Sequence, residues 1–234
     1  MTAMLALQSP DTITHRMMIA LELVDPVTGR AAGQAMRVHA PDFRPATVTR
    51  AGQIVWIDTA PSEPRKLVVE AVADRGQFAP YADILMIPPR LPGAAAIVHR
   101  VTLTPTGLYQ APPGRLSVAG MLIDTVAARQ PLAGAKVRIW LQSRNDAAVL
   151  DSNYEGLSDD RGGFVAVVGD LGGDTPMLLK PPAPDGGLVG WLAVTVGATT
   201  RHSPLLPLRQ SRPYRAPAPF AWADLAPNPP ALPI

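Results

Sequence analysis

The sequence of 234 residues contains no cysteine, so disulfide bonds, thiolate metal sites and cysteine nucleophiles are excluded. Charged residues make up only 17% of it and the net charge is +2, which gives no indication of a nucleic-acid partner. It holds no apolar run of the ~18 residues that a membrane span needs. Its first residues, Met1–Met18, lack the basic start and the long apolar core of a cleaved signal peptide. We therefore expect a protein that stays in the cytoplasm or is assembled into a particle.

Proline and glycine are abundant, with 27 and 19 residues. A proline inside a helix costs ~3 kcal/mol, so this density disfavours long helices. At the same time 47% of the residues are hydrophobic, which is enough to bury a core. The composition therefore predicts an all-β fold rather than a helical or disordered chain.

Short apolar or alternating segments recur between proline and glycine turns, which is typical of β-sandwiches. The expected strands are 17–24, 36–40, 53–57, 66–72, 84–87, 96–103, 116–123, 135–141, 163–168, 177–179 and 188–196. They divide the chain into an irregular arm (1–16), a first sandwich domain (17–92), a linker or edge strand (93–114), a second sandwich domain (115–208) and a proline-rich tail (209–234).

The two predicted sandwiches repeat one pattern. In each, an apolar strand ends at an aspartate, Asp25 or Asp124, followed by a turn and a strand that alternates with basic residues. Each then reaches a glycine that precedes an aromatic strand residue, in Gly52–Trp56 and Gly162–Phe164. An aspartate in such a turn accepts hydrogen bonds from nearby backbone N–H groups. We interpret the pattern as one β-arch used twice; chance similarity between two Gly/Pro-rich β segments is the alternative.

Three segments of the second half, Ser117–Asp124, Pro131–Val137 and Ser158–Phe164, resemble the carboxypeptidase-regulatory-like, transthyretin-like β-sandwich family. They are similar to its G-x-V-x-D opening, its P-L-x-G-A-x-V strand and its T-D-x-x-G-x-F turn, with Ser158 where threonine is usual and Met121-Leu122 in place of the common valine. The resemblance implies an Ig-like, transthyretin-like sandwich. It is nearly silent on activity, because such domains serve as spacers, stabilisers and interaction modules.

The first half has a resemblance of its own. Leu21–Gly29 and Val55–Asp58 are similar to segments of small accessory proteins of phage-tail-like contractile injection systems. This resemblance implies a place in a larger assembly, with protein subunits as partners and homo-oligomerisation as one arrangement. We therefore predict a non-enzymatic structural or adaptor component. The alternative is a carbohydrate- or protein-binding surface module of the adhesin or fibre type.

The sequence offers little for catalysis. The enzyme 5-hydroxyisourate hydrolase has a transthyretin-like fold, and its C-terminal signature is faintly similar to His202–Leu206 and Tyr214-Arg215. Its first-strand histidine is missing, because Leu21-Glu22 stands there. Hydrolysis needs a convergent set of acid–base groups. We therefore keep this activity only as a remote alternative and expect no catalytic residue.

Metal ligands are equally sparse. The four histidines stand singly, without the spacing of metal ligands. The acidic stretch Asp151–Asp160 offers oxygen ligands but does not match an EF-hand loop, and we interpret it as a solvated loop leading to a turn. We expect no metal and no cofactor, and the sequence leaves calcium and sugar binding open. The histidines are His15, His39, His99 and His202.

Aromatic residues supply the remaining candidates. Trp56, Trp140 and Trp191 lie in predicted strands and are expected in the core, whereas an exposed patch of these rings with Tyr154 would favour the sugar-binding alternative. The tail holds too many prolines for a helix or a central strand. We predict that its apolar side chains anchor it in a groove, on the body or on another subunit, and that it wraps over a partner. The predicted partner-binding residues are Tyr214, Phe220, Trp222 and Leu225.

Overall fold

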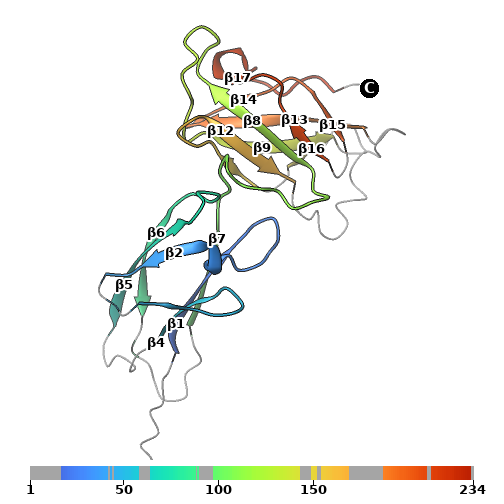
Figure 1. Ribbon diagram of the computed structural model, residues 1–234. Helices are drawn as coiled ribbons and strands as arrows, with labels where there is room; N and C mark the ends of the chain where they lie inside the picture. Colours follow the sequence, from blue (N-terminus) through green and yellow to red (C-terminus); the bar gives the residue numbers. More distant parts are fainter. Residues whose placement is uncertain are drawn as a thin grey trace, which may run out of the picture.

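The computed structural model describes residues 17–41, 43, 45–57, 64–87, 89, 97–142, 149–151, 154–168, 187–209 and 212–232. The predicted arm (1–16) and the predicted strand 177–179 lie outside these residues. Within them the regular structure is β-sheet, apart from two 3-10 turns, η1 (Gly33–Ala35) and η2 (Trp222–Asp224). Figure 1 shows two groups of sheets, formed by the first and second halves of the chain and joined by one connecting segment. The predicted all-β fold is confirmed.

The first group is a sandwich of two sheets. Its strands are β1 (Met17–Val24), β2 (Met36–His39), β3 (Thr47–Val48), β4 (Ile54–Ile57), β5 (Arg65–Ala73), β6 (Tyr81–Ile87) and β7 (Ile97–Thr102). One sheet has the order β3-β4-β1-β7 and the facing sheet the order β2-β5-β6. Inner side chains of both sheets, among them Leu21, Ile54, Leu67 and Val69, are fully buried in one core. Strand β5 alternates between this core and solvent, as expected where one sheet face packs and the other meets water.

The second group is also a sandwich. Its strands are β8 (Ser117–Ile123), β9 (Lys136–Gln142), β10 (Val149–Asp151), β11 (Gly156–Leu157), β12 (Gly163–Val167), β13 (Gly187–Val196), β14 (Thr199–His202), β15 (Leu206–Arg209), β16 (Pro213–Arg215) and β17 (Phe220–Ala221). The larger sheet has the order β10-β9-β13-β14, with β11 beside β9 and β15 beside β13. The smaller has the order β12-β8-β16, with β17 also beside β8. Leu122, Ile139, Phe164 and Leu192 are fully buried between them.

Both sandwiches are built by the same pairings. Strands β1 and β8 each pair antiparallel with the strand that follows the glycine turn, β4 and β12, and parallel with a closing strand, β7 and β16. In the facing sheets, β2 pairs antiparallel with β5 and β9 with β13. The two halves of the predicted repeat thus share one strand arrangement.

The two aspartates accept backbone hydrogen bonds within their turns, as predicted. Asp25 accepts a hydrogen bond through Oδ1 from the N–H of Val27 at 2.9 Å, and Asp124 accepts one through Oδ1 from the N–H of Gln130 at 3.1 Å. The glycines of the second turns, Gly52 and Gly162, have φ of +82° and +76°. A side chain at either would also run into a backbone oxygen, so both positions require glycine.

The segment predicted as a separate tail belongs to the second sandwich. Strand β16 pairs in parallel with Ser117–Ala119 of β8, and β17 pairs with Leu122 and Ile123 of the same strand. Because β16 is the outer strand of its sheet, its proline costs no ladder hydrogen bond to a further strand. The predicted separate tail is thus a pair of short closing strands of the second sandwich: its prolines exclude a central strand, as expected, but not an edge strand.

Residues 103–116 join the sandwiches without a gap in the packing. Leu103 and Tyr109 are buried in the first core and Leu116 in the second. Val165 and Val167, which belong to β12 of the second sandwich, pack into the first core. Apolar contact therefore runs from one sandwich into the other.

Backbone hydrogen bonds fix the same junction on both sides. The N–H of Thr106 donates to the carbonyl of Gln77 in the first sandwich at 3.1 Å, and the N–H of Leu157 in the second donates to the carbonyl of Pro105 at 2.8 Å. Gly107 lies so close to the backbone of Gly163 that a side chain would not fit. The junction is a packed element of both halves rather than a linker that swings freely.

Candidate functional site

A cavity of about 560 Å³ opens at the junction end of the first sandwich. Three segments meet there: the turn after β1, the turn between β5 and β6, and the junction. The rings of Phe78 and Tyr109 lie 5.5 Å apart, centroid to centroid, and line it together with small residues such as Ala32. Its volume falls in the range of ligand pockets.

Asp25 is the acidic residue lining this cavity, and donors surround its carboxylate. The Tyr109 hydroxyl donates to Oδ1 at 2.9 Å, next to the Val27 N–H that donates to the same oxygen. The Thr28 hydroxyl donates to Oδ2 at 3.0 Å. Burial of Tyr109, then the Asp25 charge and the hydrogen bond to it, raises the pKa of the tyrosine well above its usual range. The tyrosine therefore stays protonated and keeps the carboxylate bound in place.

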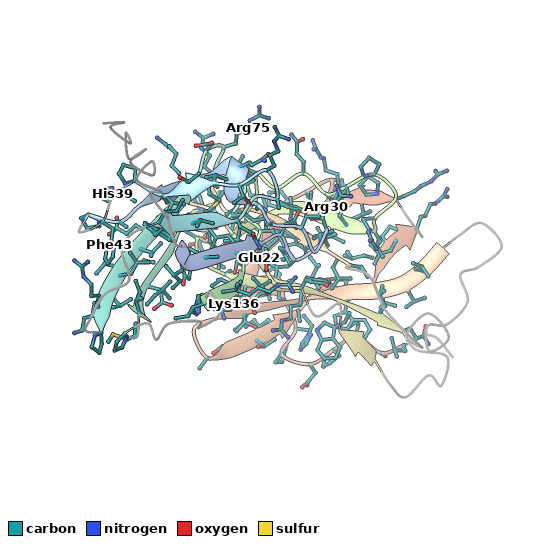
Figure 2. The ribbon with its side chains drawn as sticks, turned by 90° about the horizontal axis from the view of Figure 1, so that it is seen from below. Glu22, Arg30, His39, Phe43, Arg75 and Lys136 are labelled. Atoms are coloured by element: carbon teal, nitrogen blue, oxygen red, sulfur yellow. The ribbon has the colours of Figure 1, made fainter. Side chains whose placement is uncertain are left out.

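Two arginines, Arg30 and Arg75, line the same cavity. Within the residues that the structure describes, neither guanidinium pairs with a carboxylate, whereas Arg37 and Arg100 pair with Asp74 and Glu22. Figure 2 labels Arg75 at the upper edge of the view and Arg30 nearer its middle, with Lys136 below both. The unpaired charges of the cavity are positive.

An apolar strip crosses the outer face of β5 and β6. Val72, Ile84 and Met86 are 45%, 57% and 56% exposed. Next to it, the edge of β6 carries Asp83, whose Oδ1 accepts the N–H of Ile84 at 2.7 Å and whose Oδ2 accepts the Tyr81 hydroxyl at 3.0 Å. A charge on an edge strand opposes pairing with another strand.

The predicted partner-binding residues pack against the chain's own second sandwich. Leu225 is buried in that core, and Tyr214, Phe220 and Trp222 are half-buried against it. The Phe220 ring lies 6.1 Å from that of Phe164, and the Arg201 guanidinium lies 5.0 Å from the centre of the Trp222 ring. The four residues therefore anchor the segment on the body, the first of the two predicted locations. Contact of these residues with a partner stays a prediction.

The tryptophans do not form the exposed platform that a sugar-binding surface needs. Trp56 is buried in the first core, as predicted. Trp191 is buried as well, but beside Trp140 on the sheet face opposite to that of the core residue Leu192. Trp140, which was also predicted in the core, is instead half-buried on that same outer face and stacks on Trp191 with an interplanar angle of 12°. Tyr154 is half-buried as well. These four rings offer no shared open face.

The hydrolase-like residues do not meet in one cavity. Arg215 lines a groove of about 350 Å³ beside β8, and this groove is lined by neither His202 nor Tyr214. His202 lies on β14, where its backbone N–H donates to the carbonyl of Ala226 at 2.7 Å. Burial lowers the pKa of its imidazole. The remote hydrolase alternative gains no support from this arrangement.

The acidic stretch serves the turn before β12. Asp159 accepts through Oδ1 the N–H groups of Arg161 and Gly163, each at 2.9 Å. Glu155 pairs with Lys136 at 3.0 Å and with Arg138 at 3.4 Å. Across the described part of the chain, no three His, Cys, Asp or Glu side chains gather as metal ligands do.

Sequence reasoning did not single out Arg30 or Arg75. The sequence repeat drew attention to one part of this site, the turn at Asp25, because the turn at Asp124 is equivalent to it. It does not show that the turns before Phe78 and before Tyr109 come to the same place, which depends on pairings distant in sequence.

Comparison with known proteins adds little. No family model matches the chain, and no curated protein matches it. Among solved structures it is similar to the Bacillus anthracis TIE protein, with a TM-score of 0.24 and 9% sequence identity, over 85% of this chain and 32% of that one. The chain thus spans about a third of that structure's length, and at this TM-score the likeness carries no argument about fold or function. Among the described residues, no helix is long and apolar enough to cross a membrane.

Proposed function

We propose that this chain is a non-enzymatic structural or adaptor component of a larger protein assembly, which holds protein partners at a fixed separation. The observation that carries the proposal is the junction. Leu103, Tyr109 and Leu116 bury the connection in both cores, and Val165 and Val167 extend the first core into the second sandwich. Two sandwiches locked in this way serve a spacer better than two modules on a flexible linker.

The finer form of the proposal is a phage-tail-like contractile injection particle. It is supported by the resemblance of Leu21–Gly29 and Val55–Asp58 to accessory proteins of such systems. In this form the partners are other subunits of the particle, the chain needs neither a cofactor nor nucleic acid, and it resides in the cytoplasm until assembly.

The test is assembly with the proteins encoded beside its gene, measured by size-exclusion chromatography with light scattering. We expect a complex of defined mass that contains this chain. A short Gly-Ser insertion after Gly107, which separates the contact of Gly107 with Gly163 from the burial of Tyr109 in the first core, should prevent the complex while both sandwiches stay folded. The same insertion after Val126, which is 58% exposed in a turn of the second sandwich, is the matched control and should leave the complex intact.

Two outcomes would contradict the proposal. One is that the chain forms no complex with any neighbouring product. The other is that both insertions assemble as the original chain does, because a rigid junction would then be irrelevant to its role.

A further inference from the structure

The cavity beside the junction has the charge balance of an anion site. Among the described residues that line it, the charged ones are Asp25, Arg30 and Arg75. The Asp25 carboxylate keeps its charge but is occupied by three donors, from Val27, Thr28 and Tyr109, so the two arginines leave the lining with a formal excess of positive charge. Neither guanidinium has a carboxylate partner among the residues that the structure describes, so a ligand that brings a carboxylate would supply one.

The turn geometry positions these arginines from their backbones. The carbonyl of Arg30 accepts the N–H of Asp25 at 2.9 Å, and its N–H donates to the Thr28 hydroxyl at 3.3 Å. The N–H of Arg75 donates to Oε1 of Gln77 at 3.1 Å. The backbone of each arginine is therefore held in place by hydrogen bonds. A ligand that binds the guanidinium groups has to order the two side chains but not the turns that carry them.

The remaining lining suits a peptide. The rings of Phe78 and Tyr109 with Leu108 supply an apolar floor, and Leu108 is 60% exposed. The side-chain amides of Gln77 and Gln110 also line the cavity. Amides offer both donors and an acceptor and so match the groups of a peptide backbone.

We propose that this cavity docks an acidic peptide segment of a partner protein, with its carboxylate held by Arg30 and Arg75 and a neighbouring apolar side chain on the Phe78–Tyr109 floor. The proposal rests on the proposed function, since it names where a partner engages the spacer. A hydrogen bond to a charged group is worth enough to change affinity by about tenfold or more.

The test uses a displayed library of random short peptides, selected on the full chain and counter-selected on the double variant R30Q/R75Q. We expect enriched peptides to carry Asp or Glu beside an aromatic or aliphatic residue. Calorimetry on the synthetic peptides should show binding that weakens about tenfold or more in R30Q and in R75Q. It should weaken equally when the peptide's acid is replaced by its amide, and with rising salt.

The matched control is Arg129→Gln, which removes the same charge from the corresponding exposed turn of the second sandwich and should leave affinity unchanged. The melting temperature reports whether each variant is folded. The docking site is wrong if no peptide is enriched over the double variant, if the enriched peptides lack acids, or if the control loses as much affinity.

The complex with neighbouring proteins separates this inference from the proposed function. If that complex forms with the double variant as readily as with the original chain, the spacer role stands and this docking site is wrong. If the original chain forms no complex at all, it is the proposed function that fails.

Discussion

The two sandwiches share a strand arrangement but close differently. In the first, β7 runs unbroken along β1 from Ile19 to Val24. In the second, closure is divided between β16 and β17, with a proline-containing break over 216–219. The same arch therefore accepts a continuous or an interrupted closing strand, because the outer position makes hydrogen bonds on one side only.

Their edges are protected in different ways. Edge strand β14 of the second sandwich is bridged by Ala226, which exchanges hydrogen bonds of 2.7 and 3.0 Å with His202. Edge strand β6 of the first has no such cover within the described residues and instead carries Asp83 at the N–H of Ile84. The edge at β14 is therefore covered by the backbone around Ala226, whereas the edge at β6 carries the charge of Asp83. Of these two edges, the one in the second sandwich depends on the segment after Arg209.

Truncation after Arg209 should have the largest effect and should fall on one sandwich. It removes the closing strands and four core-facing residues, Tyr214, Phe220, Trp222 and Leu225. A fully buried large side chain contributes ~1.5–3 kcal/mol, and the three half-buried ones contribute less each. Their sum, with the lost strand pairing, is a large fraction of the ~5–15 kcal/mol stability of a typical domain. We expect the second sandwich to unfold, seen as lost protease resistance of residues 117–209. Truncation after Asn228 keeps every such contact and is the control; equal melting of both truncations would refute the assignment.

Alanine at the turn glycines should destabilise both sandwiches, the second more. Gly52 and Gly162 have positive φ, and an added Cβ meets the carbonyl oxygen of Ala31 or, more closely, of Leu122. Positive φ alone costs ~1–2 kcal/mol, and the clash adds to it. The matched controls are Gly29→Ala and Gly134→Ala, which have positive φ but open space. Urea unfolding should rank G162A below G52A and both below their controls; equal losses in all four would remove the steric argument.

Removing the Tyr109 hydroxyl should cost about 1–2 kcal/mol in the first sandwich, because it removes the hydrogen bond to Asp25. Within the described residues Asp124 accepts only from backbone N–H groups, so the second sandwich has no tyrosine to match. The raised tyrosine pKa in the folded state stabilises the fold below pH ~10 and stops doing so as pH rises further, since the unfolded phenol ionises first. The gap in unfolding free energy between the original chain and Y109F should therefore narrow above that pH. A gap that is constant through the alkaline range would contradict this role.

Asp83→Ala should have the smallest effect on folding, below ~1 kcal/mol, because the residue is exposed. Its effect should appear as concentration-dependent self-association through β6, measured by sedimentation velocity. Asp74→Ala, whose exposed partner is Arg37, removes an acid of the same sandwich away from that edge and serves as the control. Equal association of both variants would mean that Asp83 does not guard the edge.

The sequence predicted most of what is local. The strands over 17–24, 36–40, 66–72 and 188–196 are found within one or two residues of the expected bounds. The repeat was readable because aspartate and glycine are required by turn geometry. The closing strands after Arg209 were not predicted, because the prolines interrupt the alternation of apolar and polar residues by which a strand is recognised. The repeat itself held an indication of this strand. Since β1 has a parallel partner in β7, the equivalent strand β8 should have a parallel partner later in the chain.

What could not be predicted depends on distant contacts. The cavity assembles from turns near Arg30, Arg75 and Tyr109. Their proximity follows from pairings that are distant in sequence, those of β1 with β7, of β2 with β5 and of β5 with β6. The sequence also could not predict which surface the tail side chains contact. Phe220 and Trp222 would fit the groove of a partner as well as the chain's own second core, where they pack.

The late position of the second closing strand sets an order for synthesis. Strand β1 meets its parallel partner once Thr102 has left the ribosome, so the first sandwich can close while the rest is still being made. Strand β8 must wait for Pro213–Ala221, roughly a hundred residues later, and such distant pairings form slowly. During that interval β8 keeps its pairing with β12 on one side, while the side that later takes β16 has no strand beside it. That open side of β8 is therefore where a wrong strand pairing is most easily made before synthesis is complete.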